Sequence, residues 1–351
     1  MDTITSFKSL SETMSEREYH DCLAFSYSIL SKYAREGFQS LPTLFDKTES
    51  TKAMQRGSLI DAMITNGDKV NNDYVVMDNE CPPAESGVLK MLAHDMESAT
   101  LDNVDDTTVV SYCNKCSYRT NLKDDTRVKK IREQAEYYSI YKLNRTPVSK
   151  EEWLDAMNTV DAFNNSQLMS DLFGNEESKD IEYLYQQKYR KDFEVGIDET
   201  IHVKAMLDLI IVNHKDKTIR PVDLKTSANP AYMFKDNFLK YRYDIQAQLY
   251  TDMLVKVKND SHVFAEYEVL PFQFAVISQS DNVPLLFEYN PYDGINDNGL
   301  QFVSKGKTYK YKRWDELAEE IMKYMRENAT VPDGFRVDEV NSLNDMLLCG
   351  E

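Results

Sequence analysis

The chain has 351 residues, of which 42% are apolar and 28% charged, and its formal net charge is −18 at pH 7. This length supports a sizeable core, and the absence of any run of about 18 apolar residues excludes a membrane-spanning helix. Strong acidity excludes a general nucleic-acid coat, because binding a polyanion requires clustered Lys and Arg. It still allows a nuclease, whose basic residues can be concentrated in one channel while acids cover the outer surface.

The N-terminus and the cysteines both predict a cytoplasmic protein. The opening sequence MDTITSFKSLSETMSERE lacks the apolar stretch of a signal peptide. The five cysteines are an odd number, scattered along the chain, and do not form a disulfide framework. Cys113 and Cys116 form an isolated CxxC. A zinc or iron–sulfur site there would need two further ligands, so reduced structural thiols are expected.

The first 178 residues are predicted to form a mainly helical N-terminal region. Apolar spacing predicts a helix over 25–36 with Gly37 at its end, and a second helix over 54–65. A polar insertion is expected at about 78–150, with a loop around the ECPPAESG stretch. Further helices are predicted at about 124–142 and at 151–173, where Ser149 and Glu152 form a capping-box pattern.

Residues 179–351 are predicted to form an α/β core together with a C-terminal helix. A helix over 238–257 interrupts a series of strands, and another is predicted over 314–328. The element order predicts a mixed central sheet flanked by helices, and the two regions are expected to form one compact domain. The predicted strands, from period-two or continuous apolar runs, are 181–189, 193–197, 201–212, 218–226, 269–278 and 284–290.

Two carboxylates and a lysine fall on two neighbouring predicted strands. Asp208 lies on the first, and Asp223 and Lys225 lie on the same face of the second. Mg²⁺ prefers oxygen ligands, here both carboxylates and the Leu224 backbone carbonyl, and a bound metal activates water for phosphodiester hydrolysis. Unpaired charges among Leu, Ile and Val would be costly, which favours a metal. A cross-strand ion pair between Asp208 and Lys225 is the alternative.

A second group of residues surrounds this pattern in the sequence. Gln246 and Tyr250 are one helical turn apart and would position the lysine, the water or the DNA backbone, or would only pack the helix on the sheet. Lys240 and Arg242 stand among aromatic residues, which suits either a DNA-binding surface or a solvated helix face. Thr226 could donate a hydrogen bond to a phosphate or cap a loop.

The segment from Lys204 to Tyr250 resembles the PD-(D/E)XK nuclease superfamily, most closely its RecE-like, phage-type recombination exonuclease branch. The resemblance is carried by MLD at Asp208, PVDLKTS at Asp223 and Lys225, and RYDIQAQLY at Gln246. It extends to the opening helix region, to RGSLIDAMIT, to the strand pair after the Gln-Tyr helix and to the closing helix. It covers most of the chain except roughly 78–150, and it implies the PD-(D/E)XK restriction-endonuclease-like core.

What the resemblance implies is a Mg²⁺-dependent exodeoxyribonuclease, with Mn²⁺ able to substitute. Its substrate would be linear duplex DNA, degraded 5′-to-3′ to leave 3′ single-stranded tails for phage-type recombination or replication. A homo-oligomeric ring is implied, with a single-strand annealing protein as a partner. The location implied is the bacterial host cytoplasm if a phage encodes the chain.

The resemblance also implies residue roles. Asp208 and Asp223 would bind the metal, and Lys225 and Gln246 would assist catalysis. Asp61 stands where the branch has a metal-binding histidine and would be a third protein ligand, so the N-terminal region would contribute to the active site. Gln186 stands near the position of an acid in some branch members and could contact water or phosphate.

Two other functions stay open. One is an endonuclease or a single-strand-specific nuclease on the same fold. The other is a non-catalytic DNA-binding scaffold, which the departures at Asp61 and Gln186 favour. The intact pattern of Asp208, Asp223 and Lys225 favours an enzyme, because a scaffold has no need of a buried lysine beside two acids.

Overall fold

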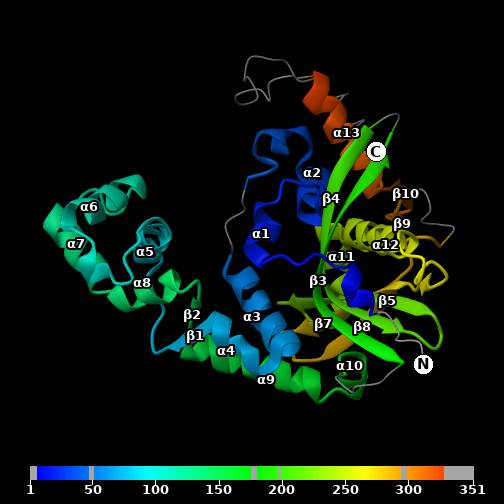
Figure 1. Cartoon of the computed structure of the whole chain (residues 1–351), viewed down its shortest axis with the longest axis horizontal. Helices are drawn as coiled ribbons and strands as arrows, with labels where there is room; N and C mark the ends of the chain where they lie inside the picture. The colour runs from blue at the N-terminus through cyan, green and yellow to red at the C-terminus, as the bar shows by residue number, and fades with distance from the viewer. Residues whose placement is uncertain (1–5, 47–50, 175–179, 197–198, 294–298, 328–351) are drawn as a thin grey trace. The chain divides into compact units, whose positions relative to one another are not determined.

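A computed structural model describes residues 6–46, 51–174, 180–196, 199–293 and 299–327 (Figure 1). The chain divides into two compact units, which we call the sheet unit (1–51 and 162–351) and the helical unit (52–161). This organisation corrects the prediction of one compact domain with a helical region up to 178. The N-terminal helices belong with the sheet, because Phe7, Phe25 and Leu30 are buried in the same hydrophobic core as the strands.

The sheet unit contains a six-stranded mixed sheet within the described residues, in the order β3-β4-β5-β7-β8 with β6 also paired to β5. The predicted α/β class is confirmed. The two strands predicted at 181–189 and 193–197 are one long strand, since it pairs with β4 along almost its whole length. The strands are β3 (Ile181–Val195), β4 (Glu199–Asn213), β5 (Thr218–Ser227), β6 (Glu268–Val269), β7 (Phe272–Ser278) and β8 (Pro284–Tyr289).

Strand β5 changes partner along its length, and this change creates the site. It pairs antiparallel with β4 only as far as Leu209 and Val222, and from Val222 onward it pairs parallel with β7. Beyond that point the first half of β4 has a different neighbour. The Phe25 N–H donates to the His202 carbonyl, and the Lys204 N–H donates to the Phe25 carbonyl, both at 2.8 Å. The N-terminal segment therefore covers the edge of β4 that β5 leaves.

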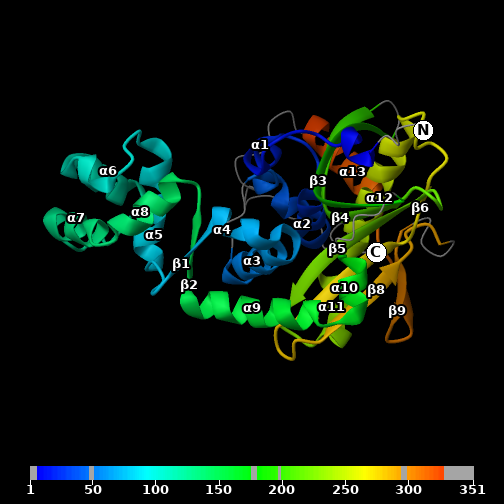
Figure 2. The same cartoon turned by 60° about the horizontal axis from the view of Figure 1, so that its bottom comes forward.

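Helices flank this sheet (Figures 1 and 2). Helix α12 contacts β3 and β4 and also packs against α2 and α13, and its buried Ile245, Leu249 and Met253 belong to the sheet core. A short hairpin of β9 (Gln301–Ser304) and β10 (Lys307–Lys310) precedes α13. The helices are α1 (Glu16–Asp21), α2 (Tyr27–Glu36), α10 (Gln167–Leu172), α11 (Phe234–Tyr241), α12 (Tyr243–Asn259) and α13 (Trp314–Glu327), with 3₁₀ turns η1 (Phe7–Leu10), η2 (Gly37–Thr43) and η5 (Ala231–Met233).

Several local predictions for the sheet unit can be compared with the structure. Gly37 ends α2 at φ +66°, a conformation that glycine adopts without strain, as predicted. The single helix predicted over 238–257 is two helices, α11 and α12. They are separated by Arg242, whose φ of +57° no helix can accommodate. The irregular tail predicted at the C-terminus lies outside the described residues, as does Cys349.

The helical unit contains its own hydrophobic core, built around Leu89, Leu92 and Tyr138, so 78–150 is a folded region. The helix predicted at 124–142 is two helices, and the predicted loop around ECPPAESG instead begins a helix at Pro83, where proline lacks only an N–H that would be unpaired anyway. The elements are α3 (Lys52–Asn66), η3 (Gly67–Lys69), α4 (Val70–Asp73), β1 (Tyr74–Met77), α5 (Pro83–Asp95), η4 (Leu101–Asn103), α6 (Asp106–Lys115), α7 (Asp124–Arg132), α8 (Ala135–Lys142), β2 (Thr146–Ser149) and α9 (Lys150–Asn164), the last crossing into the sheet unit.

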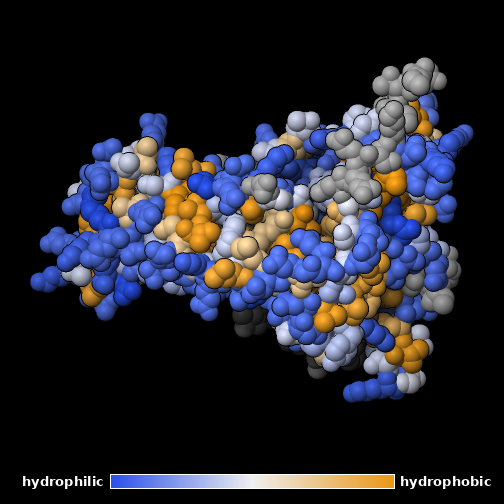
Figure 3. All heavy atoms as spheres, turned by 90° about the horizontal axis from the view of Figure 1, so that it is seen from below, coloured by the Kyte–Doolittle hydropathy of each residue, from blue (hydrophilic) through white to orange (hydrophobic). Residues whose placement is uncertain are grey.

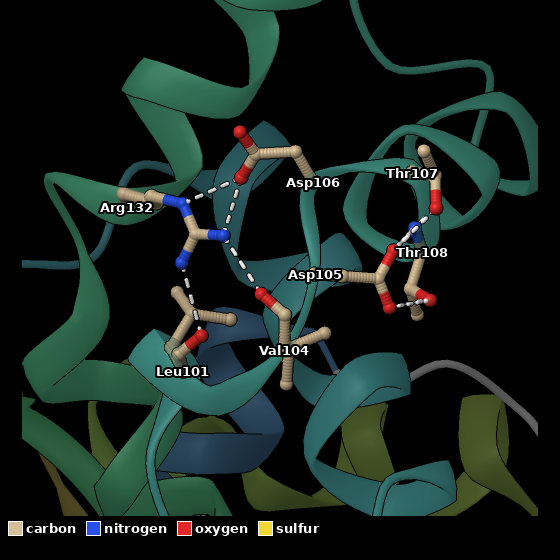
Figure 4. Close-up of polar contacts among 7 residues, drawn as sticks. All are labelled: Leu101, Val104, Asp105, Asp106, Thr107, Thr108 and Arg132. Carbon is tan, nitrogen blue, oxygen red and sulfur yellow. Dashed lines mark hydrogen bonds and ion pairs between the residues drawn. The ribbon is translucent and has the colours of Figure 1, made fainter.

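Polar side chains of the helical unit form hydrogen bonds with backbone groups in loops and at helix ends (Figure 4). The Arg132 guanidinium donates to the Leu101 and Val104 carbonyls at 3.0 and 2.7 Å and pairs with Asp106. The Asp105 carboxylate accepts the Thr108 N–H at 2.8 Å and so caps α6. At α9 the predicted capping box is confirmed, with the Glu152 N–H donating to Ser149 Oγ at 3.2 Å and the Ser149 N–H donating to Glu152 Oε2 at 3.1 Å.

In the part of the chain that the structure describes, no helix is long and apolar enough to cross a bilayer. Hydrophilic residues predominate on the face shown in Figure 3, with hydrophobic residues in smaller patches among them. The four described cysteines, including Cys113 and Cys116, are free thiols, and burial raises the pKa of both members of the CxxC.

Candidate active site

The two acidic residues lie where β4 and β5 part. Asp208 and Asp223 are the next residues on each strand beyond the last antiparallel pair, Leu209 with Val222. Asp208 Oδ2 accepts the Leu224 N–H at 2.9 Å. The Asp208 side chain therefore satisfies a backbone donor of β5 that has no backbone partner on β4. In an extended strand the N–H and C=O of one residue point to the same side, so the Leu224 carbonyl also lies on the β4 side of β5.

Lys225 lies directly against Asp223. Its Nζ is 2.6 Å from Asp223 Oδ2, and the Asp223 residue is only 2% exposed. The ion pair in the structure thus joins two residues of one strand. Burial by itself lowers the pKa of Lys225, but the Asp223 carboxylate, with further contributions from Tyr243 and Asp208, outweighs it and raises the pKa. The Asp223 carboxylate therefore favours the charged form of the lysine.

Gln246 holds the other oxygen of the same carboxylate. Its Nε2 donates to Asp223 Oδ1 at 2.6 Å, and the residue is 4% exposed. Tyr250, one turn later on α12, is also buried. Burial raises the pKa of Tyr250 well above its ordinary value, and Tyr19, Asp223 and Asp208 raise it further. The predicted pairing of Gln246 and Tyr250 on one helix face is confirmed, and that face is turned toward the acids.

Gln186 stands beside Asp208 on β3. On β3 and β4, Tyr185 pairs with Leu209 and Gln187 pairs with Leu207. Gln186 and Asp208 lie between these two pairs and do not pair with each other in the ladder. Gln186 adopts φ +51°, a conformation costly for a residue with a side chain, which is often found at functional positions. It borders a hollow of about 420 Å³, lined by Lys8, Ser11, Glu12, Thr13, Met14, Ser15, Glu18, Gln186, Gln187 and Lys188.

The residues predicted to contact DNA are placed very differently. Arg242 is buried, forms a two-bond pair with Asp244 at 2.9 and 3.0 Å, donates to the Lys312 carbonyl and lies over the Tyr311 ring. We correct its predicted role, because a guanidinium engaged inside the protein supports the helix break and offers no surface cation. Lys240 is exposed, and Thr226, next to Lys225 on β5, is half-buried. Their predicted DNA contacts stay predictions.

Asp61 lies on α3 in the helical unit, half-buried beside the core residues Ile60 and Ala62. The Thr65 hydroxyl donates to its backbone carbonyl at 2.8 Å. Its assignment as a metal ligand stays a prediction from the family resemblance.

Two tyrosines near Lys225 were not identified from the sequence. The Tyr243 ring lies 4.8 Å from Lys225 Nζ, and the Tyr27 ring is 6.1 Å from that of Tyr243. Tyr243 is three residues before Gln246 on the same helix, a spacing that could have indicated it. Tyr27 is nearly 200 residues away in the sequence, and no local pattern connects it to the site.

The chemistry of the donors fits a hard divalent cation. The site supplies carboxylate oxygens from Asp208 and Asp223 on either side of the Leu224 backbone contact, and oxygen donors are what Mg²⁺ and Mn²⁺ prefer. Among the residues that the structure describes, no group of three or more His, Cys, Asp or Glu side chains is placed to hold a metal ion. A metal here would therefore be completed by the backbone, the substrate or water.

Comparison with known proteins adds no family. No protein family matches the chain, and no curated protein matches its sequence. Ten chains of solved structures match. One of them, described as the crystal structure of SSO0001, is 13% identical, with 69% of this chain and 84% of that chain covered and a TM-score of 0.29. A similarity this low carries no inference about function.

Proposed function

We propose that this protein is a Mg²⁺-dependent nuclease that hydrolyses phosphodiester bonds in DNA. One observation carries the proposal: Asp208, Asp223 and Lys225 converge at the parting of β4 and β5. A buried carboxylate held between an ammonium and an amide at 2.6 Å each is fixed in position before any substrate arrives. Such preorganisation is what catalytic groups require and what a surface ion pair lacks.

Each side chain has a defined part in this proposal. Asp208 and Asp223 would hold the cation, with the Leu224 carbonyl as a further oxygen. When bound, the metal would polarise the phosphate and lower the pKa of a water. Gln246 keeps Asp223 Oδ1 oriented, and the Lys225 ammonium beside Asp223 can orient the attacking water or stabilise the charge developing on the phosphate.

The finer proposal is an exodeoxyribonuclease that degrades linear duplex DNA 5′-to-3′ and leaves 3′ single-stranded tails. Its support is the resemblance of several motifs, in order, to the RecE-like branch. A ring-shaped homo-oligomer and an annealing partner belong to the same proposal. A ring would place basic residues in a lumen and would accommodate the net charge of −18.

The test uses linear duplex DNA labelled at either the 5′ or the 3′ end, with Mg²⁺, Mn²⁺ or EDTA. We expect metal-dependent release of nucleotides, with the 5′ label lost first and covalently closed DNA left intact. Asp223→Asn and Lys225→Met should abolish release. Lys307→Met, an exposed lysine of β10, is the matched control and should cut as wild type does.

The alternatives give different outcomes in the same assay. Cutting of closed circles would indicate an endonuclease, and cutting only of single strands would indicate a single-strand-specific enzyme. DNA binding without cleavage by the wild type, with no Mg²⁺ or Mn²⁺ binding lost in Asp208→Ala by calorimetry, would indicate a scaffold. Equal cleavage by wild type, Asp223→Asn and Lys225→Met would disprove the assigned site.

A further inference from the structure

The Tyr243 ring is held rigidly next to Lys225. Tyr243 is the first residue of α12, immediately after the left-handed Arg242. Its ring stacks on Phe234 with centroids 5.6 Å apart and planes 17° apart, and it lies 5.9 Å from the Phe274 ring. Phe234 and Phe274 are both buried in the sheet core. The face of Tyr243 that Lys225 Nζ approaches, at 4.8 Å from the centroid, therefore has little freedom to move.

Tyr27 braces this arrangement from a different part of the chain. It is the first residue of α2, and its hydroxyl donates to the Tyr241 carbonyl at 2.8 Å. Tyr241 ends α11, two residues before Tyr243, and the Tyr27 ring is 6.1 Å from the Tyr243 ring. This hydrogen bond connects α2 to the junction of α11 and α12, where Tyr243 lies.

We propose that Tyr243, braced by Tyr27, is a positioning residue that keeps the Lys225 ammonium against Asp223. A lysine side chain is a flexible chain of four carbons, and contact with one carboxylate does not restrict it to a single orientation. The Tyr243 face adds a second attraction on the same ammonium, which disfavours orientations that lose either contact. The contact itself stands on the geometry, whereas its catalytic consequence rests on the proposed nuclease function.

The contact can be measured without any activity assay. Protein labelled with ¹³C at lysine Cε is examined by NMR, and the Lys225 signal is identified by its loss in Lys225→Arg. A methylene near an aromatic face is shifted upfield by the ring current, so Lys225 should be an upfield outlier in the wild type. Tyr243→Phe should keep that shift and Tyr243→Leu should remove it. An unchanged Lys225 signal in Tyr243→Leu would overturn the proposal.

A matched control separates positioning from packing. Phe238 belongs to the same aromatic cluster, 6.2 Å from Phe234 and 5.1 Å from Tyr289. Phe238→Leu removes a comparable ring, and we expect it to leave both the Lys225 shift and the cleavage rate unchanged. Loss of the shift in Phe238→Leu as well would mean that general loosening of the core is responsible, and would overturn the proposal.

Kinetics then test the consequence. We expect Tyr243→Leu to lower kcat about tenfold with KM changed by less than about twofold, since the lysine acts on the reacting phosphate. Tyr243→Phe should restore kcat, and Tyr27→Leu should show a smaller loss. A normal kcat in Tyr243→Leu, with the ring-current shift gone, would overturn the positioning role alone. A wild type that shows the shift but cuts no DNA would overturn the proposed function and leave the contact supported.

Discussion

Both units contain buried charged groups, but these groups connect different parts of the chain. In the sheet unit, Asp223, Lys225 and Gln246 come from two elements and direct their polar atoms at one another. In the helical unit, buried Arg127 pairs with Asp124 and donates to Asn114 and to the Tyr118 carbonyl, all within the consecutive segment from α6 to α7. Both units bury charge, so burial by itself does not mark a site. What distinguishes the sheet unit is convergence of several charged groups at a point where strands separate.

The largest effect should follow from neutralising the central carboxylate of the sheet unit. We expect Asp223→Asn to reduce cleavage by about 10³-fold or more, because it removes a metal ligand and the charge that holds Lys225. Thermal stability should also fall, because the Lys225 ammonium loses its buried carboxylate partner, although the amide can still accept from Gln246. Comparison of kcat/KM and melting temperature with wild type checks this. A large loss of stability with retained cleavage would place Asp223 among structural groups like those of the helical unit.

A second large effect concerns Asp252, a half-buried carboxylate of α12 that accepts the Trp314 Nε1–H at 2.6 Å. Burial raises its pKa to about 6 from an ordinary value of 3.8, despite the lowering effects of Trp314 and Arg313, with Asp315 raising it further. The folded state therefore holds this proton more tightly than the unfolded state. The stabilisation is complete below about pH 4 and is lost as pH rises to about 6.

We therefore expect Asp252→Asn to be more stable than the wild type above pH 6, by roughly 2–3 kcal/mol, and no more stable at pH 4. The chain has two tryptophans, Trp153 in the helical unit and Trp314 in the sheet unit. Urea unfolding followed by Trp314 fluorescence, in a Trp153→Phe background, reports on the sheet unit alone. If Asp252→Asn raised the free energy of unfolding equally at pH 4 and pH 7, the raised pKa assigned to Asp252 would be contradicted.

A third prediction addresses the helical unit. Arg127→Met should destabilise that unit by about 2 kcal/mol, because it removes charge-assisted hydrogen bonds to Asn114 and Tyr118. Urea unfolding followed by Trp153 fluorescence, in a Trp314→Phe background, measures the change. In the otherwise wild-type chain, kcat should stay the same. A fall in kcat without unfolding would show that the helical unit supplies part of the chemistry.

The smallest expected effect is that of Gln246→Leu. It leaves Asp223 Oδ1 without its amide donor while the ion pair with Lys225 remains, so we expect kcat to fall about tenfold. Gln246→Glu tests the same contact with a group that cannot donate when ionised, and should be at least as impaired. Rates equal to wild type in both variants would make Gln246 a packing residue.

The sequence by itself determined the α/β class, most of the strands, the end of α2 at Gly37 and the capping box at Ser149. These depend on periodicity and on residues a few positions apart, which a linear pattern contains. It also placed Asp208, Asp223 and Lys225 on adjacent strands, and Gln246 with Tyr250 on one helix face. The hairpin between β4 and β5 is short, so their proximity is local too.

Only the tertiary structure decided where β5 leaves β4 for β7, and therefore where the acids lie. It showed that 78–150 folds around its own core, that Arg242 is buried, and that Tyr27 braces Tyr243 beside Lys225. Each of these depends on strand partners and helix packing that bring residues together across tens to hundreds of positions. No spacing in the sequence specifies such contacts, because they result from burying the whole core at once.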